Sequence, residues 1–289
     1  MRLYLDAERL HKLARENHAT YVRGEPFPHV VLDNVLPDEM LDTVLRDFPS
    51  ADSNVWREYR NYHEGKLETQ GEGNVSDDIS LVLYQFNSAP FIRFLQELTG
   101  IDGLIPDPYY TGGGLHQIPR GGRLGIHADF ARHPHLELHR RLNVLVYLNK
   151  NWRDEYGGGL ELWTADQQRC VEVIAPVFNR MVVFSITDWA YHGHPKPLSC
   201  PTGVTRKSLA LYYFTVARPE GEVDPSKEST RFIPLPGEHV PEGTIFDRGA
   251  SYTGAVERRK GLLHGAIKAI APPIALGAAR RLRERKRRP

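Results

Sequence analysis

A histidine and an aspartate two residues apart are the first pair in this sequence that could do chemistry. They lie in GGRLGIHADF, residues 121–130, where a Gly-rich turn leads into an apolar stretch typical of a strand. Positions i and i+2 of a strand project to one face, so His127 and Asp129 should lie side by side. Such a pair is a surface patch, a buried hydrogen-bonded couple or two ligands of a metal ion, and the spacing alone leaves all three open.

A further pair of histidines follows a later apolar stretch. In MVVFSITDWAYHGHP, residues 181–195, a strand-like run leads to His192 and His194. Two histidines and one carboxylate on one face of an octahedron are the usual ligands of non-haem Fe(II) oxygenases. The alternative is that both are loop histidines near the surface. If a metal binds, either histidine could be the third donor at this point.

An arginine opens the last long apolar run, TRKSLALYYFT, residues 205–215. Arg206 and Ser208 share one face of the expected strand. A guanidinium that points into an apolar core needs an anionic partner, and its fork matches a carboxylate. Ser208 could add a hydroxyl to the same carboxylate. The partner is either an internal acid such as Glu161 or Asp188, or a carboxylate ligand.

The elements that must position these residues are mostly strands. After residue 105 short apolar runs follow one another, separated mainly by Gly, Pro, Asn or Asp. These runs are GLHQI, RLGIHAD, RLNVLVYLN, GLELW, CVEVIA, RMVVFSI and KSLALYYFTV. Runs of this length and spacing predict an all-β barrel or sandwich rather than alternating β and α units.

The part before residue 105 is predicted to be mainly helical. Periodicity and turn residues predict helices over 4–18, 37–49 and 89–100, a strand over 26–36, and a polar, turn-rich stretch over 50–80. The helices should pack on the outside of one sheet. The aromatic and polar segment 54–86 is either a lid over the barrel mouth or a long solvated loop.

The order of several motifs resembles one enzyme family. HAD, RLNVLVYLNKNW, GGGLELW, IAPVFNRMVVF, YHG and RKSLALYYF follow one another as in the Fe(II)/2-oxoglutarate-dependent oxygenases of the prolyl 4-hydroxylase type. The likeness covers about residues 105 to 216. It implies a double-stranded β-helix, a squashed barrel of two sheets, so we expect a mainly β protein with flanking helices.

Carried onto this sequence, the resemblance implies site residues and cofactors. His127, Asp129 and His192 would bind Fe(II), with His192 favoured over His194; Arg206, Tyr147, Ser208 and Gln117 would bind 2-oxoglutarate. O2 would be the oxidant and ascorbate a reductant. The family often has a tyrosine before the Gly-rich turn, where this chain has His116 and Gln117. The chain also inserts PKPLSCPTG between the last histidine and Arg206.

The resemblance implies an enzyme that hydroxylates a C–H bond and releases succinate and CO2. Asp129 favours hydroxylation over halogenation, because relatives that halogenate lack the carboxylate. The expected substrate is a small or amino-acid-like molecule. A peptidyl proline is the alternative, followed by a non-catalytic cupin-like binding barrel and by a hydrolase or isomerase with another divalent metal.

Composition adds a predicted organisation. The 289 residues carry a net charge of +1, but segment 257–289 has 11 Lys or Arg against two acids. We expect the following parts: helices, the first strand and the lid over 1–104, the catalytic core over 105–218, an extension over 219–256, and a basic amphipathic tail over 257–289. The tail could bind an anionic membrane surface, could bind nucleic acid without sequence specificity, or could be an appendage that packs loosely on the acidic body or stays disordered; no specific nucleic acid is expected.

The location expected from sequence is cytoplasmic, with peripheral membrane attachment through the tail. The charged first 18 residues lack the apolar segment of a signal peptide, and no apolar run reaches the roughly 18 residues of a membrane span. Cys170 and Cys200 are the only cysteines, which fits a reducing compartment. A disulfide between these two remains open.

Overall fold

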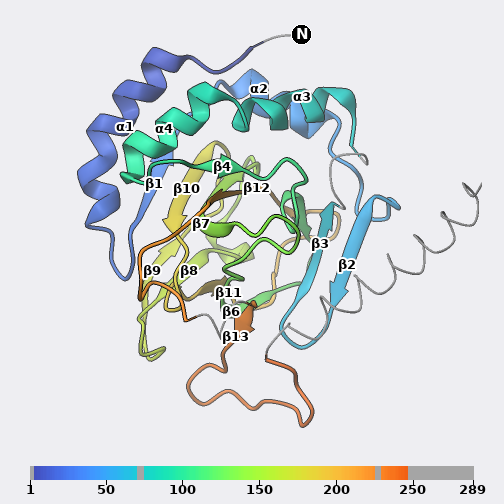
Figure 1. Ribbon diagram of the computed structural model, residues 1–289. Coiled ribbons are helices and arrows are strands. Elements are labelled where there is room, and N and C mark those ends of the chain that lie inside the picture. The colour runs from blue at the N-terminus through green and yellow to red at the C-terminus, as the bar shows by residue number, and fades with distance from the viewer. Residues whose placement is uncertain (1–2, 70–74, 225–228, 247–289) are drawn as a thin grey trace, which may run out of the picture. The chain divides into compact units, whose positions relative to one another are not determined.

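Two β-sheets face each other at the centre of the molecule (Figure 1). The computed structural model describes residues 3–69, 75–224 and 229–246, so the predicted tail over 257–289 lies outside the described residues. The eight-stranded sheet has the order β1-β10-β7-β12-β5-β3-β2, with β4 beside β12. Its strands are β1 (His29–Asp33), β2 (Trp56–Arg60), β3 (Gly65–Thr69), β4 (Ile105–Pro106), β5 (Gly114–Ile118), β7 (His139–Tyr147), β10 (Arg180–Ser185) and β12 (Arg206–Thr215).

The five-stranded sheet has the order β13-β6-β11-β8-β9. Its strands are β6 (Leu124–Ala128), β8 (Leu160–Trp163), β9 (Cys170–Ile174), β11 (His192–His194) and β13 (Arg231–Phe232). From β5 to β12 the chain passes back and forth between the two sheets, and all paired strands are antiparallel. The predicted double-stranded β-helix is therefore confirmed.

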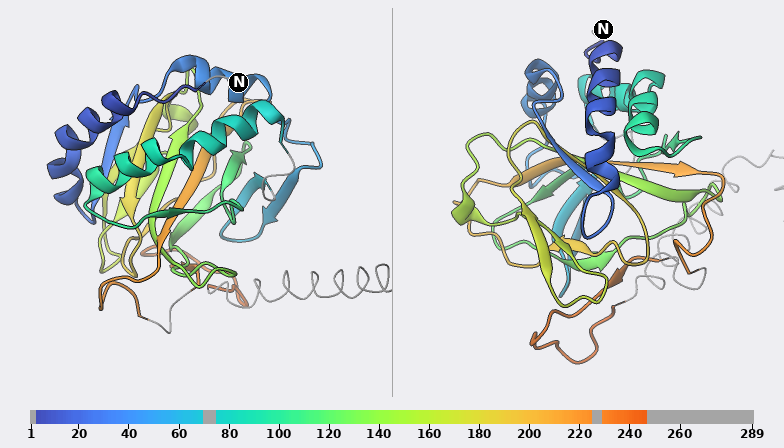
Figure 2. Two further views of the ribbon diagram at one scale, coloured as in Figure 1. Left: turned by 45° about the horizontal axis from the view of Figure 1, so that its top comes forward. Right: turned by 90° about the vertical axis from the view of Figure 1, so that its left-hand side faces the viewer.

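Among the described residues, four helices cover the outer face of the larger sheet (Figure 2). They are α1 (Ala7–Val22), α2 (Asp38–Arg46), α3 (Asp77–Phe86) and α4 (Ala89–Thr99). Asp6 caps α1 by accepting bonds from two backbone N–H groups, and α4 ends at Gly100 with φ 72°. The helices predicted over 4–18, 37–49 and 89–100 and their place outside a sheet are confirmed within a few residues.

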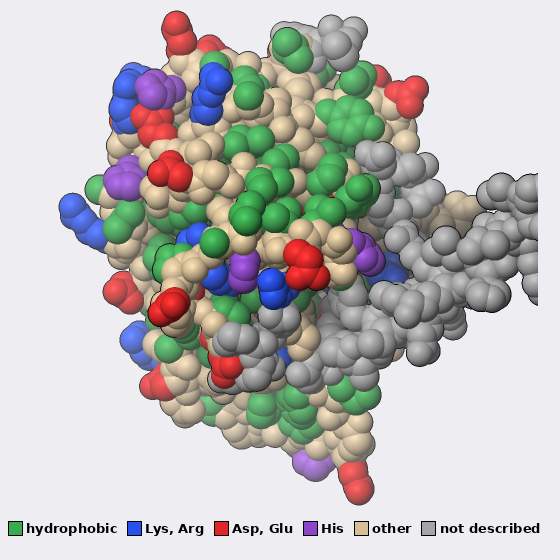
Figure 3. All heavy atoms as spheres, in the orientation of Figure 1, with side chains coloured by type: hydrophobic (Ala, Val, Ile, Leu, Met, Phe, Trp, Pro, Cys, Tyr) green, Lys and Arg blue, Asp and Glu red, His purple; other side chains and the backbone are tan. Residues whose placement is uncertain are grey.

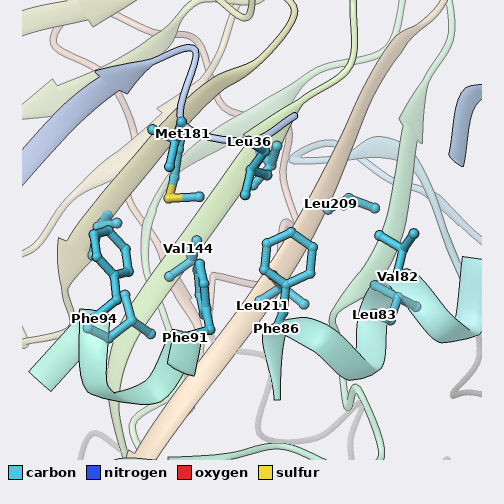
Figure 4. Close-up of a cluster of buried hydrophobic side chains, with 14 of the residues drawn as sticks. Leu36, Val82, Leu83, Phe86, Phe91, Phe94, Val144, Met181, Leu209 and Leu211 are labelled. Carbon is cyan, nitrogen blue, oxygen red and sulfur yellow. The ribbon is translucent and has the colours of Figure 1, made fainter. Parts of the chain in front are cut away.

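The helices and the larger sheet share one apolar core (Figure 4). Phe91 and Phe94 of α4 and Phe86 of α3 pack onto the sheet residues Val144 and Leu211, and all five are almost fully buried. Each buried ring of this size contributes roughly 3 kcal/mol of hydrophobic stabilisation. The core rigidly holds the sheet whose other face looks into the barrel.

Alternation along the strands separates this core from the barrel interior. Leu209 and Leu211 of β12 face the helices, so Arg206 and Ser208 face the barrel on the same strand. The partner strand β7 does the same, because Val146 faces the helices and its neighbour Tyr147 belongs to the inner cluster. The interior thus receives polar side chains from a sheet that is apolar on its other face.

The stretch expected to be polar and turn-rich, 50–80, is instead largely ordered structure. Strands β2 and β3 form a hairpin that extends the larger sheet beside β5, and α3 begins at Asp77. The sequence did not predict β3 because Lys66 and Glu68 face the interior although they are charged. The strand therefore lacks the alternation of apolar and polar residues that marks a half-buried strand. The segment 54–86 is therefore not a long solvated loop, since most of it packs against the larger sheet.

Within the described part of the chain, each helix is too short or too polar to cross a lipid bilayer. Cys170 and Cys200 are both free thiols.

Candidate active site

Three side chains that the sequence singled out meet inside the barrel. His127 is the last residue but one of β6, Asp129 directly follows that strand, and His192 opens β11 directly opposite His127. The imidazole Nε2 atoms of His127 and His192 lie 3.5 and 3.4 Å from the two carboxylate oxygens of Asp129. One donor atom from each residue lies within 4.8 Å of the others. A divalent metal ion could be held by all three.

Backbone carbonyls fix the ring orientation of both histidines. Nδ1 of His127 lies 2.9 Å from the carbonyl oxygen of Gly125, and Nδ1 of His192 lies 2.9 Å from that of Ala190. A carbonyl only accepts hydrogen bonds, so each Nδ1 carries a proton and each Nε2 is the ring atom left to bind a metal ion. This donor set, two imidazoles and a carboxylate, fits Fe(II).

Two residues of β7 hold Asp129. The amide of Asn143 donates to Asp129 Oδ2 at 2.7 Å, and Arg140 Nη2 donates to the same oxygen at 3.2 Å. Burial opposes the carboxylate charge, but the Arg140 charge and the two histidines hold the pKa of Asp129 well below its usual value. Arg140 itself is 1% exposed and lies over the Tyr212 ring, 3.4 Å from its centroid. The carboxylate is thus ionised and fixed in place.

Nothing in the sequence marks Arg140 as part of the site, because an arginine near a strand end is usually solvated. In the structure its guanidinium is buried and bonded to Asp129 and Asn143. Asn143 was missed altogether. The sequence could have identified Asn143, because positions 143, 145 and 147 share one face of a strand and Tyr147 was expected in the site.

A second polar group lies on the inner face of the larger sheet. Arg206, at the start of β12, is 5% exposed; its Nε donates to the Gly158 carbonyl at 2.7 Å and its Nη2 to the Tyr147 hydroxyl at 3.2 Å. Ser208 lies opposite Tyr147 on the same face. Burial lowers the pKa of Arg206, which Tyr147 partly offsets. The structure therefore brings Arg206, Tyr147 and Ser208 together.

Arg206 has no acidic partner among the described residues. The acids considered from sequence are engaged elsewhere: Glu161 accepts from the Trp163 indole at 2.9 Å, and Asp188 pairs with Arg231 at 3.5 Å. The internal salt bridge is thus not formed. A buried guanidinium bonded only to neutral groups is suited to an anionic ligand.

Gly158 in the GGG turn leaves room for Arg206. Its φ is 74°, and a Cβ atom there would lie 3.0 Å from Arg206 Cδ and 2.5 Å from Leu198 Cδ2. A side chain would therefore clash as well as strain the backbone. The turn both frees space for the guanidinium and supplies the carbonyl that orients it.

One predicted site residue lies on the wrong face. Gln117 pairs with Lys207 on β12, so it points to the helix side of the sheet, opposite to Arg206 and Ser208. Its amide oxygen accepts from the Thr205 hydroxyl at 2.7 Å. The assignment of Gln117 to the 2-oxoglutarate site is therefore corrected. Its neighbour His116 pairs with Ser208 and faces the interior instead.

The interior also holds a charged cluster that the sequence did not reveal. Lys66 Nζ lies 3.1 Å from Glu68 Oε2, and the Tyr59 hydroxyl donates to Glu68 Oε1 at 2.6 Å. Burial, then the Lys66 charge, lowers the pKa of His116 to about 4. The only signal was that GKLET places Lys66 and Glu68 at alternate positions of one strand.

His194 lies on the same strand as His192 but outside the set of metal donors. The donor set of His127, Asp129 and His192 does not include it. Burial first, then the positive charge of Arg206, holds the pKa of His194 well below its ordinary value. This arrangement agrees with the preference for His192 as the ligand.

The comparisons with known proteins agree with this geometry. Residues 113–214 match the family model described as the 2OG-Fe(II) oxygenase superfamily. No curated protein matches the chain.

Solved structures of similar fold include a prolyl hydroxylase from Trichoplax adhaerens, in complex with a hypoxia inducible factor peptide. It is 19% identical with a TM-score of 0.53 and covers 72% of this chain and 91% of its own. A prolyl-4-hydroxylase from Pseudomonas putida is 15% identical with a TM-score of 0.49, and covers 71% of this chain and 99% of its own.

The family match spans β5 to β12, the strands that carry both the metal donors and Arg206. The likeness to the Trichoplax structure independently gives the fold. Residues 113–214 therefore form a domain of the 2OG-Fe(II) oxygenase superfamily, and the chain is a 2-oxoglutarate-dependent dioxygenase that uses Fe(II).

Proposed function

We propose that the enzyme hydroxylates an unactivated C–H bond of a small-molecule or amino-acid-like substrate and releases succinate and CO2. The observation that carries the proposal is Arg206, a buried cation bonded only to neutral groups, in the same interior as three metal donors. A binding barrel without catalysis would have no use for this combination.

In this proposal His127, Asp129 and His192 hold Fe(II). Their hydrogen bonds support that role, because both Nε2 atoms and the Asp129 carboxylate converge on one point. Bound Fe(II) supplies the activation of O2 that couples oxidation of 2-oxoglutarate to hydroxylation of the substrate. Asp129 favours hydroxylation over halogenation. Ascorbate would keep the iron reduced.

The 2-oxoglutarate molecule would extend from the metal donors to Arg206. Arg206 would pair with its distal carboxylate, and Tyr147 and Ser208 would donate their hydroxyl groups. The Tyr147 hydroxyl is fully buried and bonded to Arg206, so one charge-assisted bond already orders the pair. The residues of the chain thus bind and orient the cosubstrate and exclude water from it.

The proposed size and polarity of the substrate rest on the surroundings of the site. His127 and His192 are 5% and 4% exposed, so little room is open at the metal donors. Lys66, Glu68 and His116 bring both signs of charge into the interior. A small polar or zwitterionic molecule suits an interior that carries both signs of charge. On the outer face drawn in Figure 3, acidic, basic and histidine side chains lie next to a broad hydrophobic area.

A peptidyl proline is the second candidate. It is favoured by the fold, since the Trichoplax prolyl hydroxylase was solved with a peptide fragment. A peptide substrate would need an open groove beside the metal donors, and their low exposure favours the small substrate.

Succinate release with Fe(II), 2-oxoglutarate and ascorbate tests the reaction. We expect release that depends on both cofactors and rises with amino acids or related metabolites, together with a product that has gained one oxygen atom. Proline-containing peptides in the same assay test the second candidate. No cofactor-dependent succinate under any condition would contradict the proposed reaction.

We further propose that the catalytic unit does not require segment 257–289, that this basic segment attaches the enzyme to anionic membranes, and that the protein works in the cytoplasm. The charge of the segment and the two free thiols support these proposals.

A further inference from the structure

His194 is a buried histidine whose ring makes no hydrogen bond to the described residues. The side chain is 2% exposed, and both Nδ1 and Nε2 are buried without a partner. A buried polar atom without a hydrogen bond destabilises the folded state, so such atoms are rare in folded proteins. An imidazole with two of them calls for a functional explanation.

The strand geometry directs His194 into the barrel. The bulge between β11 and β6 places the extra residue on β6, where His127 and Leu124 face His192 and His194. Strand β11 is therefore regular, and His194 shares the inner face with His192.

The pairing of β11 with β8 places His194 close to Arg206. Gly193 pairs with Glu161, so His194 continues along β8 toward Gly158, whose carbonyl oxygen accepts from Arg206 Nε at 2.7 Å. Arg206 lies on the inner face of the opposite sheet. The His194 ring and the Arg206 guanidinium therefore enter the same part of the interior.

No described acid is available to satisfy either His194 or Arg206. The two residues come from different sheets and face the same space, which combines a cationic fork with an imidazole. Every protonation state and tautomer of imidazole carries at least one N–H, so His194 can donate to an anion in all of them. A carboxylate has room for both donors, because its two oxygens accept about four hydrogen bonds.

We propose that His194 donates a hydrogen bond to the distal carboxylate of 2-oxoglutarate, beside Arg206 and Tyr147. This inference rests on the proposed binding of 2-oxoglutarate at Arg206. His194 then has a role separate from that of His192: one histidine of the HGH sequence binds the metal ion and the other binds the cosubstrate.

The test measures the affinity for 2-oxoglutarate by calorimetry, with enzyme loaded with Mn(II) as a redox-inert substitute for Fe(II). His194→Phe and His194→Met remove the donor and keep an apolar side chain of similar size. We expect binding about 10- to 100-fold weaker for both, because each variant loses a hydrogen bond to a charged group. His194→Gln keeps a donor and should bind within about threefold of the wild type. Affinity for Mn(II) should stay unchanged in all three.

His29→Phe is the matched control. His29 is similarly buried at 6% exposure, but both of its ring nitrogens are already paired, with the Phe27 carbonyl and with Glu172, each at 2.9 Å. Its replacement should alter thermal stability without changing the affinity for 2-oxoglutarate. Two apolar variants at 194 guard against one of them failing to fold.

A cosubstrate analogue locates the bond. 2-Oxopentanoate lacks the distal carboxylate, so the wild type and His194→Phe should bind it equally. Equal binding of 2-oxoglutarate by the wild type and folded His194→Phe would overturn the inference. So would a defect that persists with 2-oxopentanoate, or a loss of Mn(II) affinity. If wild-type enzyme binds Mn(II) but no 2-oxoglutarate, the proposed function itself fails.

Discussion

The two ends of the active site differ in how their charges are balanced. At the metal end, formed by His127, Asp129 and His192, the one ionised group is paired inside the protein, because Arg140 and Asn143 both bond to Asp129. At the anchor end, formed by Arg206, Tyr147 and Ser208, the guanidinium bonds only to a carbonyl and a hydroxyl. The metal end is built as a fixed donor set, whereas the anchor end selects an anion.

The difference predicts separable defects. Damage to the metal end should weaken metal binding and all that depends on it. Damage to the anchor end should weaken 2-oxoglutarate binding and leave the metal affinity unchanged, because none of its residues belongs to the metal donor set.

Asp129→Gly should have the largest effect. It removes one of three metal donors and leaves the buried Arg140 without its acid, so turnover should fall below detection. Iron content and succinate release measure the two losses. Asp102→Gly, an exposed loop aspartate, serves as the control and should keep full activity. Normal turnover in Asp129→Gly would remove Asp129 from the metal end.

Arg206→Ala comes next. A buried ion pair that loses one partner costs roughly 2–5 kcal/mol, so 2-oxoglutarate should bind about two to three orders of magnitude more weakly. Metal affinity should remain as in the wild type. Tyr147→Phe, which deletes only one hydroxyl, should weaken binding by about tenfold or less. If Arg206→Ala binds 2-oxoglutarate normally, the anchor end has been assigned wrongly.

Asn143→Ala should have a smaller effect at the other end. It removes the 2.7 Å bond to Asp129 but no donor, and loss of such a supporting contact lowers metal affinity by about 10- to 100-fold. Asn149→Ala is the control: this residue is also buried, but it bonds to the Pro176 and Lys207 carbonyls. The control should lose stability without losing metal affinity. If Asn143→Ala and Asn149→Ala bind the metal equally well, Asn143 does not support the metal end and the distinction between the two ends is wrong.

The sequence was most informative where strands alternate cleanly. The runs that became β5, β6, β7, β10 and β12 were all recognised, and His127 and Asp129 were paired correctly because i and i+2 share a face. The same rule distinguishes His116 from Gln117, because these two neighbours on β5 point to opposite faces of the sheet. The error at Gln117 came from choosing a residue by its place in the motif rather than by its face.

Other features depended on tertiary contacts that no local pattern encodes. The hairpin of β2 and β3 buries Lys66 and Glu68, and pairing with each other and with Tyr59 and Glu64 stabilises these buried charges. Arg140 looks like a solvated arginine until β7 is placed beside Asp129. The lack of hydrogen-bond partners for the His194 ring likewise becomes evident only when the two sheets are placed face to face.

The last prediction concerns the basic segment 257–289. All residues with a proposed role in the chemistry lie on or beside strands of the two sheets, so deletion of this segment should leave turnover of a small substrate unchanged. The segment carries 11 Lys or Arg against two acids, with apolar residues between them, and this composition favours anionic membranes. Full-length protein should therefore co-sediment with phosphatidylserine vesicles at low salt, and the truncated protein should not. Vesicles of neutral lipid are the control. If full-length protein ignores the anionic vesicles, the membrane proposal is wrong. If truncation abolishes turnover in a folded protein, the active site extends beyond the two sheets and the two-ended description fails.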